Sequence, residues 1–358
     1  MSVVLRVHAT IEAALAACPP PTGRRTAIAV PDGTRPVPVA GALASIRPWL
    51  TGEVSAVVGL GLHRPMRADE LPASPFPLLQ HDPDDTVATR HIDGIPGHVS
   101  RHIAGADVVL GLGIVELHQY AGFSGGHKAV AVGLGGRATL DALHHRDRVV
   151  APGVALGQLA GNPFRAAVDA LGEAAGCTWT LLTTGRGWVA GPPREALAVA
   201  AASLDCWEDL ERRYPAAVLH VPARKAVNFY QASRAATYLG LTERPPLVPG
   251  ATLYLEATCP EGMGEGAGEQ AFARVLADRA PPWGALLDGP APVGAGTQRA
   301  VMLALLARRF PLVVCGTERP EELRACGLVA TSAPAREVAP SDALVVDDPF
   351  GRLPRLRA

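Results

Sequence analysis

The stretch TAIAVPDGTRP at Thr26–Pro36 joins a short apolar run directly to a group of polar residues. Its first five residues are small or β-branched, which is typical of a buried β-strand. Asp32 and Arg35 follow this strand at once. A strand that ends in polar residues suits the edge of a sheet where a ligand binds.

The same arrangement recurs twice further along the chain. The predicted strand Val54–Leu60 runs into His63, and the predicted strand Ala106–Leu112 leads to His118. Any single one of these polar residues can be an ordinary loop residue. Their recurrence after successive strands predicts that Asp32, Arg35, His63 and His118 line one rim of one sheet.

Apolar, β-branched runs alternate with Ala- and Leu-rich stretches over the whole chain. This alternation predicts an α/β fold with largely parallel sheets flanked by helices. The stretch Leu71–Asp85 is predicted to be a surface loop. Further predicted strands are Ala217–Val221, Thr252–Glu256, Leu312–Cys315 and Leu344–Val346, and predicted helices are Val7–Ala17, Leu156–Ala175, Arg194–Trp207 and Lys225–Leu239.

A chain of 358 residues is too long for one typical core, so we expect two domains. A charged segment, Glu208–Arg213, ends a predicted helix, and a new strand begins soon after Tyr214. We therefore place a cofactor-binding domain at residues 1–210 and a substrate-contacting domain at residues 211–358. The active site is expected in the cleft between them.

Charge and composition exclude several classes of protein. The net charge is −1 and the pI is about 6.8. The chain as a whole therefore has no excess positive charge that would attract nucleic acid or an anionic membrane. The six cysteines form no C-x-x-C pair, which argues against a disulfide framework and a thiolate zinc site. The apolar runs are shorter than a membrane span, and the N-terminus lacks a signal-peptide core. A cytoplasmic protein is expected.

The block from Glu116 to Lys128 holds the densest group of unusual residues. Its core is AGFSGGHK, with Gly122, Ser124, Gly125 and Gly126 before Lys128. Glycines let backbone N–H groups turn inward around a phosphate, although a plain tight turn explains them equally. The spacing matches neither a P-loop nor a dinucleotide fingerprint. Lys128 is either a surface lysine or a nucleophile toward a carbonyl or acyl group.

Two later segments add candidate polar residues. His144 and His145 are adjacent, and neighbours on a helix do not face the same way, so at most one is expected to be a ligand. Gln231 and Arg234 lie three residues apart on a predicted helix and share a face that can hold a carboxylate. An ordinary polar helix face remains the alternative.

The ordered set of motifs resembles the lactate racemase family over nearly the whole chain. The spacings from His118 to Lys128 and from Lys128 to His144, which are 128 − 118 = 10 and 144 − 128 = 16 residues, match the family pattern and select His144 over His145. The blocks that carry the resemblance are Pro31–Pro36, His63–Pro65, His118–Lys128, His144, and Tyr230-Gln231 with Arg234, with lesser echoes at Gly161–Pro163 and Cys259–Gly264.

The resemblance implies a nickel-pincer nucleotide as cofactor. Lys128 would hold it through a thioamide bond, and His144 would be the protein ligand to nickel, for which imidazole is a suitable donor. His63 and His118 would be the catalytic acid/base pair, with Asp32 orienting a catalytic histidine.

Other roles follow from the same resemblance. Arg35, Tyr230, Gln231 and Arg234 would bind the substrate, and Ser124, Gly122, Gly125 and Gly126 would approach the cofactor. The family usually has lysine at the position of Arg234. The positive charge is kept, but the planar guanidinium of arginine replaces the compact ammonium group of lysine. This departure leaves the identity of the 2-hydroxy acid open.

The expected function is therefore racemisation or epimerisation of a 2-hydroxy acid, by hydride transfer through a 2-keto acid. The proteins that make the cofactor would be transient partners. A zinc-dependent hydrolase that uses the histidines is one alternative, although the sequence has no close H-x-x-x-H pair. A binding protein that keeps the cofactor without catalysis is another.

Overall fold

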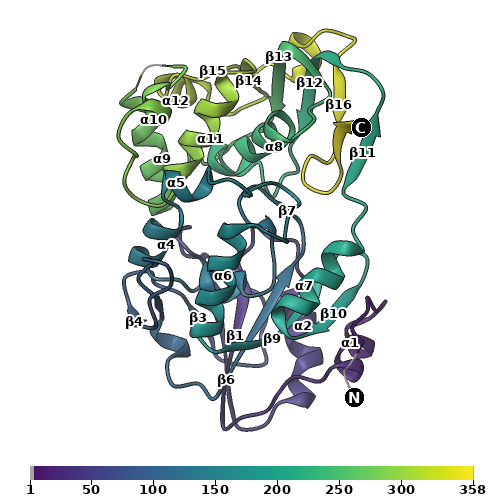
Figure 1. The fold of residues 1–358 in the computed structure, drawn as a ribbon, viewed down its shortest axis with the longest axis vertical. Coiled ribbons are helices and arrows are strands. Elements are labelled where there is room, and N and C mark those ends of the chain that lie inside the picture. Colours follow the sequence, from purple (N-terminus) through teal and green to yellow (C-terminus); the bar gives the residue numbers. More distant parts are fainter. Residues whose placement is uncertain (1–3, 280, 358) are drawn as a thin grey trace. The chain divides into compact units, whose positions relative to one another are not determined.

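The computed structural model describes residues 4–279 and 281–357. The chain forms two compact units, and Figure 1 traces both from purple to yellow along the sequence. One unit takes in the chain up to Leu143 and residues 148–204. The other takes in the short segment His144–Asp147 and the chain from Asp205 onward. The second of these units includes His144, the predicted nickel ligand.

The first unit is built on a six-stranded sheet in the order β10-β9-β6-β1-β2-β3. Five strands run parallel, and only the edge strand β10 is antiparallel to its neighbour β9. The strands are β1 (Arg25–Pro31), β2 (Glu53–Gly59), β3 (Leu78–Gln80), β6 (Val108–Ile114), β9 (Cys177–Thr183) and β10 (Trp188–Gly191).

Both faces of this sheet are covered, as expected for parallel strands. Successive residues of β1 point to opposite faces: Ile28 and Val30 join one hydrophobic cluster, and Ala27 and Ala29 join another. The first cluster includes residues of α1 (Ile11–Ala17) and α2 (Val39–Ile46), and the second includes Val130 of α3 (Lys128–Ala131). The sheet therefore lies inside a three-layer unit.

The second unit contains a five-stranded sheet in the order β15-β14-β13-β12-β16, in which all pairs are parallel. The helices α8 (Phe229–Leu241), α9 (Ala267–Ala277) and α11 (Gln298–Ala307) pack together, and α8 contacts the central strand β13. The strands are β12 (Tyr214–His220), β13 (Leu247–Glu256), β14 (Leu312–Cys315), β15 (Val329–Ala330) and β16 (Leu344–Val346).

Shorter elements complete the two units. Three two-stranded sheets pair β4 with β5, β7 with β8 and β11 with β17. The remaining helices and strands of the two units are η1 (Arg47–Trp49), β4 (Thr86–Ala88), β5 (His98–Ser100), η2 (Arg101–Ile103), β7 (Leu117–His118), β8 (Gly122–Phe123), α4 (Arg137–Leu143), α5 (Arg146–Val149), α6 (Pro163–Ala174), α7 (Pro193–Ala202), β11 (Trp207–Leu210), α10 (Ala285–Asp288), α12 (Pro320–Ala325), α13 (Ala335–Val338) and β17 (Leu353–Leu356).

The predicted α/β class with parallel sheets is confirmed, and each of the seven predicted strands overlaps an observed one. Three of the four predicted helices start too early, because polar caps fix the observed starts: Thr10 caps α1, Asn162 caps α6 and Asn228 caps α8.

Two further predictions about segments were wrong. The helix predicted to reach Trp207 ends at Ala202, and Trp207 begins β11, which pairs with β17. The segment predicted as the loop Leu71–Asp85 contains β3, whose residues pair with β2.

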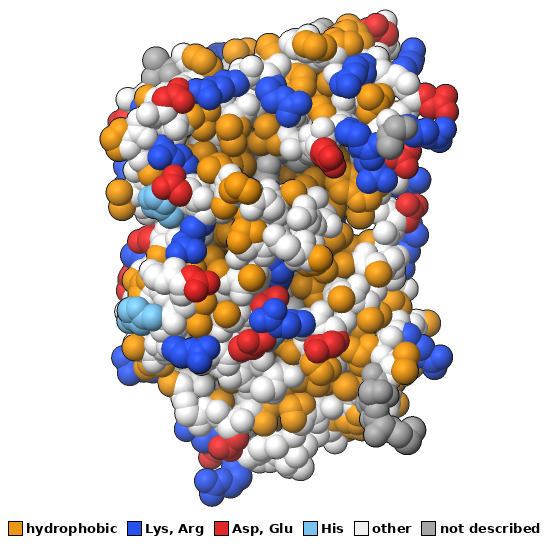
Figure 2. All heavy atoms as spheres, in the orientation of Figure 1, with side chains coloured by type: hydrophobic (Ala, Val, Ile, Leu, Met, Phe, Trp, Pro, Cys, Tyr) orange, Lys and Arg blue, Asp and Glu red, His pale blue; other side chains and the backbone are white. Residues whose placement is uncertain are grey.

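On the face of the molecule shown in Figure 2, positive and negative side chains are interspersed among hydrophobic ones. This mixture agrees with the net charge of −1. Among the described residues, no helix has the length and apolar character needed to cross a membrane.

Candidate functional site

The carboxyl ends of three neighbouring parallel strands of the first unit carry the strongest candidates. Asp32 follows β1, His63 follows β2, and Glu116 follows β6, with β1 paired to both of the other strands. These three residues therefore lie at the same edge of the sheet. Open α/β sheets bind ligands at this edge.

Asp32 and His63 are in direct contact. Oδ2 of the buried Asp32 lies 2.6 Å from Nδ1 of His63. The other carboxylate oxygen, Oδ1, accepts hydrogen bonds from the backbone N–H of Thr34 at 3.1 Å and from its hydroxyl at 2.6 Å. The turn after β1 therefore holds the carboxylate in one orientation.

The charge state of this pair follows from its surroundings. Burial alone raises the pKa of Asp32, but the charge and hydrogen bond of His63, the Thr34 hydroxyl and the charge of Arg35 outweigh it, so the pKa lies below its ordinary value. An ionised carboxylate only accepts hydrogen bonds, so Nδ1 of His63 carries a proton. In the neutral form of the ring, the lone pair that can accept a proton is then on Nε2.

His118 has a different environment. It lies on β7, where His118 pairs with Gly122 of β8 in a short hairpin, and it is 8% exposed. Its Nδ1 accepts hydrogen bonds from the backbone N–H groups of Tyr120 at 3.3 Å and Ala121 at 3.1 Å. The ring also meets Tyr120 edge to face, with centroids 5.6 Å apart. The hairpin thus fixes the ring from its Nδ1 side.

An ion pair connects these two segments. Nη1 of Arg35 lies 3.5 Å from Oε2 of Glu116, and both side chains are largely buried. Arg35 is three residues beyond Asp32, and Glu116 is two residues before His118. Because of this pair, the structure brings together the predicted residues of the β1 and β6 ends. Glu116 begins the unusual block Glu116–Lys128 of the sequence, but no motif predicts a role for it.

The glycines of the AGFSGGHK segment are required by packing within the protein. Gly122, Gly125 and Gly126 all have positive φ, at 73°, 92° and 61°. A Cβ on Gly122 would lie 2.0 Å from the carbonyl oxygen of Gln158, and one on Gly126 would lie 3.0 Å from that of Pro193. These contacts and the positive φ angles account for the glycines as parts of a tight turn.

Ser124 ties the same segment to β6. Its hydroxyl donates to the carbonyl of Ile114 at 2.6 Å and accepts from the backbone N–H of Glu116 at 2.9 Å. The backbone N–H of Ser124 donates to the Glu116 carbonyl at 2.9 Å. These bonds fix the position of Glu116. The role of Ser124 in cofactor binding stays a prediction.

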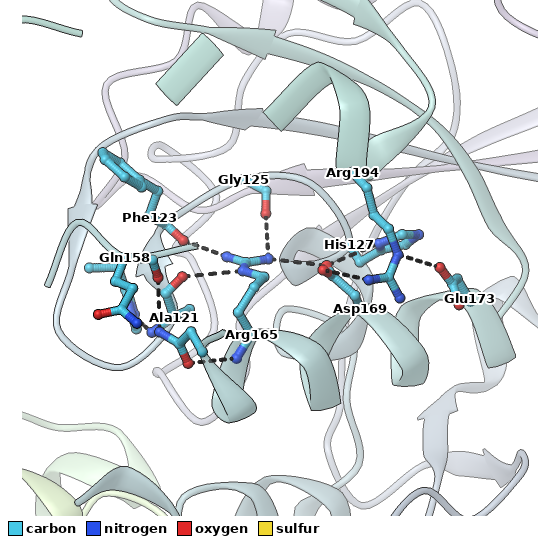
Figure 3. Close-up of polar contacts among 11 residues, drawn as sticks. Ala121, Phe123, Gly125, His127, Gln158, Arg165, Asp169, Glu173 and Arg194 are labelled. Carbon is cyan, nitrogen blue, oxygen red and sulfur yellow. Dashed lines mark hydrogen bonds and ion pairs between the residues drawn. The ribbon is translucent and has the colours of Figure 1, made fainter. Parts of the chain in front are cut away.

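A buried arginine holds the segment from the other side (Figure 3). Arg165 of α6 donates to the carbonyls of Ala121 at 3.2 Å and Gly125 at 3.4 Å, and also to that of Phe123. Its guanidinium lies 3.3 Å from the carboxylate of Asp169. Arg165 thus connects three carbonyls of the tight turn to α6.

Asp169 connects this clamp to a wider network. Its carboxylate accepts from Nδ1 of His127 at 3.1 Å and lies 3.3 Å from Arg194, which also binds Glu173. Burial raises the pKa of Asp169, but the hydrogen bond from His127 and the charge of Arg165 outweigh it and lower the pKa. Figure 3 shows these side chains on α6 and α7 beside the segment.

The sequence does not predict this clamp, because an isolated arginine in a helix gives no local signal. The signal that was available is Asn162, part of the Gly161–Pro163 echo. Asn162 caps α6 by accepting from Arg165 N–H at 3.0 Å, and its amide donates to the Tyr120 carbonyl at 2.8 Å.

Lys128 and His144 are the residues predicted to hold the cofactor and its metal. Lys128 begins α3 and is half-buried. His144 follows the end of α4 and is also half-buried, whereas His145 is exposed and its Nδ1 accepts from Asp147 N–H at 3.4 Å. The structure therefore gives His145 a local role in the turn before α5. The two histidines lie in this turn rather than within a helix.

The predicted substrate residues Tyr230, Gln231 and Arg234 all lie on α8 in the second unit. Arg234 donates to Oε1 of Gln231 at 3.1 Å and to the hydroxyl of Tyr238 at 2.7 Å. Its guanidinium also lies over the rings of Tyr238 and Phe350. The planar guanidinium of Arg234 is therefore held by two side chains and two rings. A lysine has no planar group that could make the same set of contacts.

The chemistry of these residues fits the implied cofactor in part. A lysine amine can form a thioamide, and an imidazole is a suitable nickel donor, so Lys128 and His144 fit. The glycine-rich segment gives no independent sign of a nucleotide, because its conformation is explained by protein contacts. Within the described residues, no three His, Cys, Asp or Glu side chains are grouped to hold a metal, which is the group that the zinc-hydrolase alternative needs.

Comparison with known proteins gives similarities of three kinds: a family model, a curated relative and solved structures. Residues 13–157 match the family model described as the lactate racemase N-terminal domain. A curated lactate racemase from Lactiplantibacillus plantarum is 28% identical over 149 residues, which cover 37% of this chain and 35% of that protein. The matched stretch is thus about a third of that relative's length.

Two solved structures share the fold. The lactate racemase apoprotein from Thermoanaerobacterium thermosaccharolyticum has a TM-score of 0.77 at 17% identity, covering 99% of this chain and 95% of its own. A protein from Thermotoga maritima has a TM-score of 0.73 at 15% identity, covering 97% of each chain.

Proposed function

We propose that this chain, which belongs to the lactate racemase family, inverts the configuration at C2 of a 2-hydroxy acid. The observation that carries the proposal is the Asp32–His63 pair beside the Arg35–Glu116 ion pair, at the carboxyl ends of adjacent strands. A base next to a cation suits a substrate with a hydroxyl beside a carboxylate.

The reaction requires the C2–H bond to break, and a proton next to a carboxylate is very weakly acidic. Removal of hydride avoids a carbanion, and the nickel-pincer nucleotide supplies a hydride acceptor when bound. We propose that Lys128 holds this group covalently and that His144 is the nickel ligand. Ser124, Gly122, Gly125 and Gly126 would shape the segment next to it.

The side chains of the protein handle the proton and the carboxylate. His63, with Asp32 behind it, takes the hydroxyl proton of one enantiomer, and His118 is the second acid/base residue, which serves the other enantiomer. The planar 2-keto acid formed between them turns to present its other face. Arg35 binds the carboxylate, and we propose contacts with substrate for Tyr230, Gln231 and Arg234. A cytoplasmic location and transient contact with the cofactor's biosynthetic proteins belong to the same proposal.

The test uses protein co-expressed with the proteins that make the cofactor, and it measures both enantiomers of a panel of 2-hydroxy acids. We expect one acid to be interconverted, with activity abolished in His63→Ala while cofactor stays bound. Retained activity in that variant would overturn the assignment of the base.

Mass spectrometry and elemental analysis separate the alternatives. A nucleotide adduct that is absent in Lys128→Ala, and nickel that is lost in His144→Ala, support the proposal. Zinc without an adduct supports the hydrolase. An adduct with nickel, but without inversion of any acid in the panel, supports a non-catalytic binding protein.

A further inference from the structure

The segment that carries the proposed nickel ligand belongs to a different unit from the residues on either side of it. His144–Asp147 group with the second unit, whereas Leu143 before them and Arg148 after them group with the first. Lys128, the proposed cofactor anchor, also belongs to the first unit. The segment must therefore contain a residue that attaches it to the second unit.

Arg146 makes this attachment. Its Nη1 donates hydrogen bonds to the backbone carbonyls of Gly289 at 2.6 Å and of Leu286 and Leu287 at 3.4 Å each. The side chain is 19% exposed, so most of it is shielded from water. All three carbonyls lie in the carboxyl-terminal end of α10 or directly after it. The last carbonyls of a helix lack partners within the helix, and an arginine is a suitable donor to them.

The sequence after α10 explains why these carbonyls accept a side-chain donor. The N–H that would continue the helical bonding from the Leu286 carbonyl is that of Pro290, and proline has none. Gly289 donates its own N–H to the carbonyl of Ala285 at 3.0 Å, which closes the last turn. Arg146 thus supplies the donor that Pro290 cannot supply.

The helix α10 connects this contact to the helix that carries the predicted substrate residues. Leu286 is fully buried, and α10 packs against α11, which packs against α8. At the start of α11, the amide of Gln298 donates to the hydroxyl of Tyr230 on α8 at 3.4 Å. The path from Arg146 to α8 therefore stays within the second unit.

We propose that Arg146 is a positioning residue for the nickel ligand, because it binds the segment His144–Asp147 to α10 and so fixes the place of His144. This inference rests on the proposed function, which makes His144 the ligand. His144 lies two residues before Arg146, so a displacement of this short segment moves the imidazole with it. A metal is bound tightly only where the surrounding residues hold its ligand in one position.

Arg148 provides a matched control two residues further along. It lies on the same short helix as Arg146, α5, and its guanidinium also donates to a backbone carbonyl, that of Asp93. This carbonyl belongs to the first unit. Arg148→Met therefore removes an arginine from α5 without removing the contact with α10.

The first test uses protein co-expressed with the proteins that make the cofactor. Mass spectrometry measures the adduct on Lys128, and elemental analysis follows the loss of nickel to EDTA over time. We expect Arg146→Met to keep the adduct but to lose nickel at least ~10-fold faster than the wild type, since loss of a ligand's support weakens metal binding by about 10–100-fold. Arg148→Met should lose nickel at the wild-type rate. Release at the wild-type rate from Arg146→Met, or equal acceleration in both variants, would overturn the inference.

The second test uses the same proteins without cofactor and measures backbone hydrogen exchange by mass spectrometry. We expect residues 144–147 to exchange faster in Arg146→Met than in the wild type, and at the wild-type rate in Arg148→Met. Unchanged exchange of this segment in Arg146→Met would show that Arg146 does not hold it, and would also overturn the inference.

Two further outcomes are separated by these tests. If Arg146→Met does not fold, Arg146→Gln replaces it, because the shorter amide cannot reach the same three carbonyls but keeps a polar side chain, and the same results are expected. A wild type that carries neither adduct nor nickel would count against the proposed function. Hydrogen exchange would still decide whether Arg146 holds the segment.

Discussion

Nδ1 of His63 lies 2.6 Å from Oδ2 of Asp32, and the second carboxylate oxygen is held by Thr34. This arrangement fixes the ring and supplies a negative charge behind it. We expect Asp32→Asn to lower kcat by about 10²–10⁴-fold, because the amide cannot stabilise the imidazolium and can bind the wrong tautomer. Chiral assay of the loaded enzyme measures the change.

Thr34→Val is the matched control for this change. It removes the 2.6 Å hydroxyl bond to Asp32 but leaves the carboxylate in place. We expect a loss of roughly tenfold or less, since one neutral hydrogen bond contributes about 0.5–1.5 kcal/mol. An Asp32→Asn enzyme as active as the Thr34→Val enzyme would show that the charge has no part in catalysis.

Gly122→Ala tests whether the tight turn is needed for stability. Gly122 has a φ of 73°, and its Cβ would meet the Gln158 carbonyl oxygen at 2.0 Å. Gly185 has a similar φ of 78°, but a Cβ there meets nothing within 4 Å among the described residues. We expect Gly185→Ala to lower the free energy of unfolding by about 1–2 kcal/mol from backbone strain alone. Gly122→Ala should cost clearly more, as measured by urea denaturation, and equal losses would mean that the Gln158 contact relaxes freely.

The sequence predicts the sheet edge well because strand ends are marked locally. Val30 and Val58 are buried, and the polar residues of the rim follow directly after their strands, so periodicity alone locates Asp32 and His63. The hydrogen-bonding environment of His118 could not be predicted in this way. It depends on a hairpin and on Asn162, which lies 44 residues away in the sequence.

The clamp on the glycine-rich segment was missed for a related reason. Arg165 contacts carbonyls about 40 residues earlier in the chain, and backbone carbonyls leave no mark in a sequence. The glycines are plain in the sequence, but a phosphate-binding turn and an ordinary tight turn both use this kind of glycine-rich sequence. Only the atoms that surround Gly122 and Gly126 distinguish them.

Arg165→Met should destabilise the first unit strongly. The change leaves the Asp169 carboxylate without its buried arginine, and it removes the donor to the carbonyls of Ala121 and Gly125. Breaking a buried ion pair on one side costs about 3–5 kcal/mol. Arg194→Met is the control, because Arg194 contacts the same carboxylate at 3.3 Å but is 47% exposed, so we expect about 1 kcal/mol or less. Urea denaturation of both variants measures the difference, and similar values would contradict the clamp.

Arg64 and Glu70 form a two-pronged ion pair beside His63, with both N–O distances at 2.7 Å. The hydrogen bonds from Arg64 lower the pKa of Glu70 to about 2. A carboxylate with a lowered pKa in the folded state stabilises the protein above its unfolded pKa of about 4.3, and this contribution is lost as the pH falls through about 2.

Glu70→Gln should therefore destabilise the protein at pH 7 and matter less at pH 3. The pair is partly exposed, with 23% and 32% of the two side chains accessible, so we expect only about 1 kcal/mol at pH 7 after solvent screening. Glu53→Gln is the control, because Glu53 is 86% exposed and lies 3.9 Å from Arg25, and its effect should be smaller at both pH values. Urea denaturation of the three proteins at the two pH values gives the comparison. A Glu70→Gln deficit that grows as the pH falls would reverse the expected sign and show that Arg64 does not stabilise the ionised carboxylate.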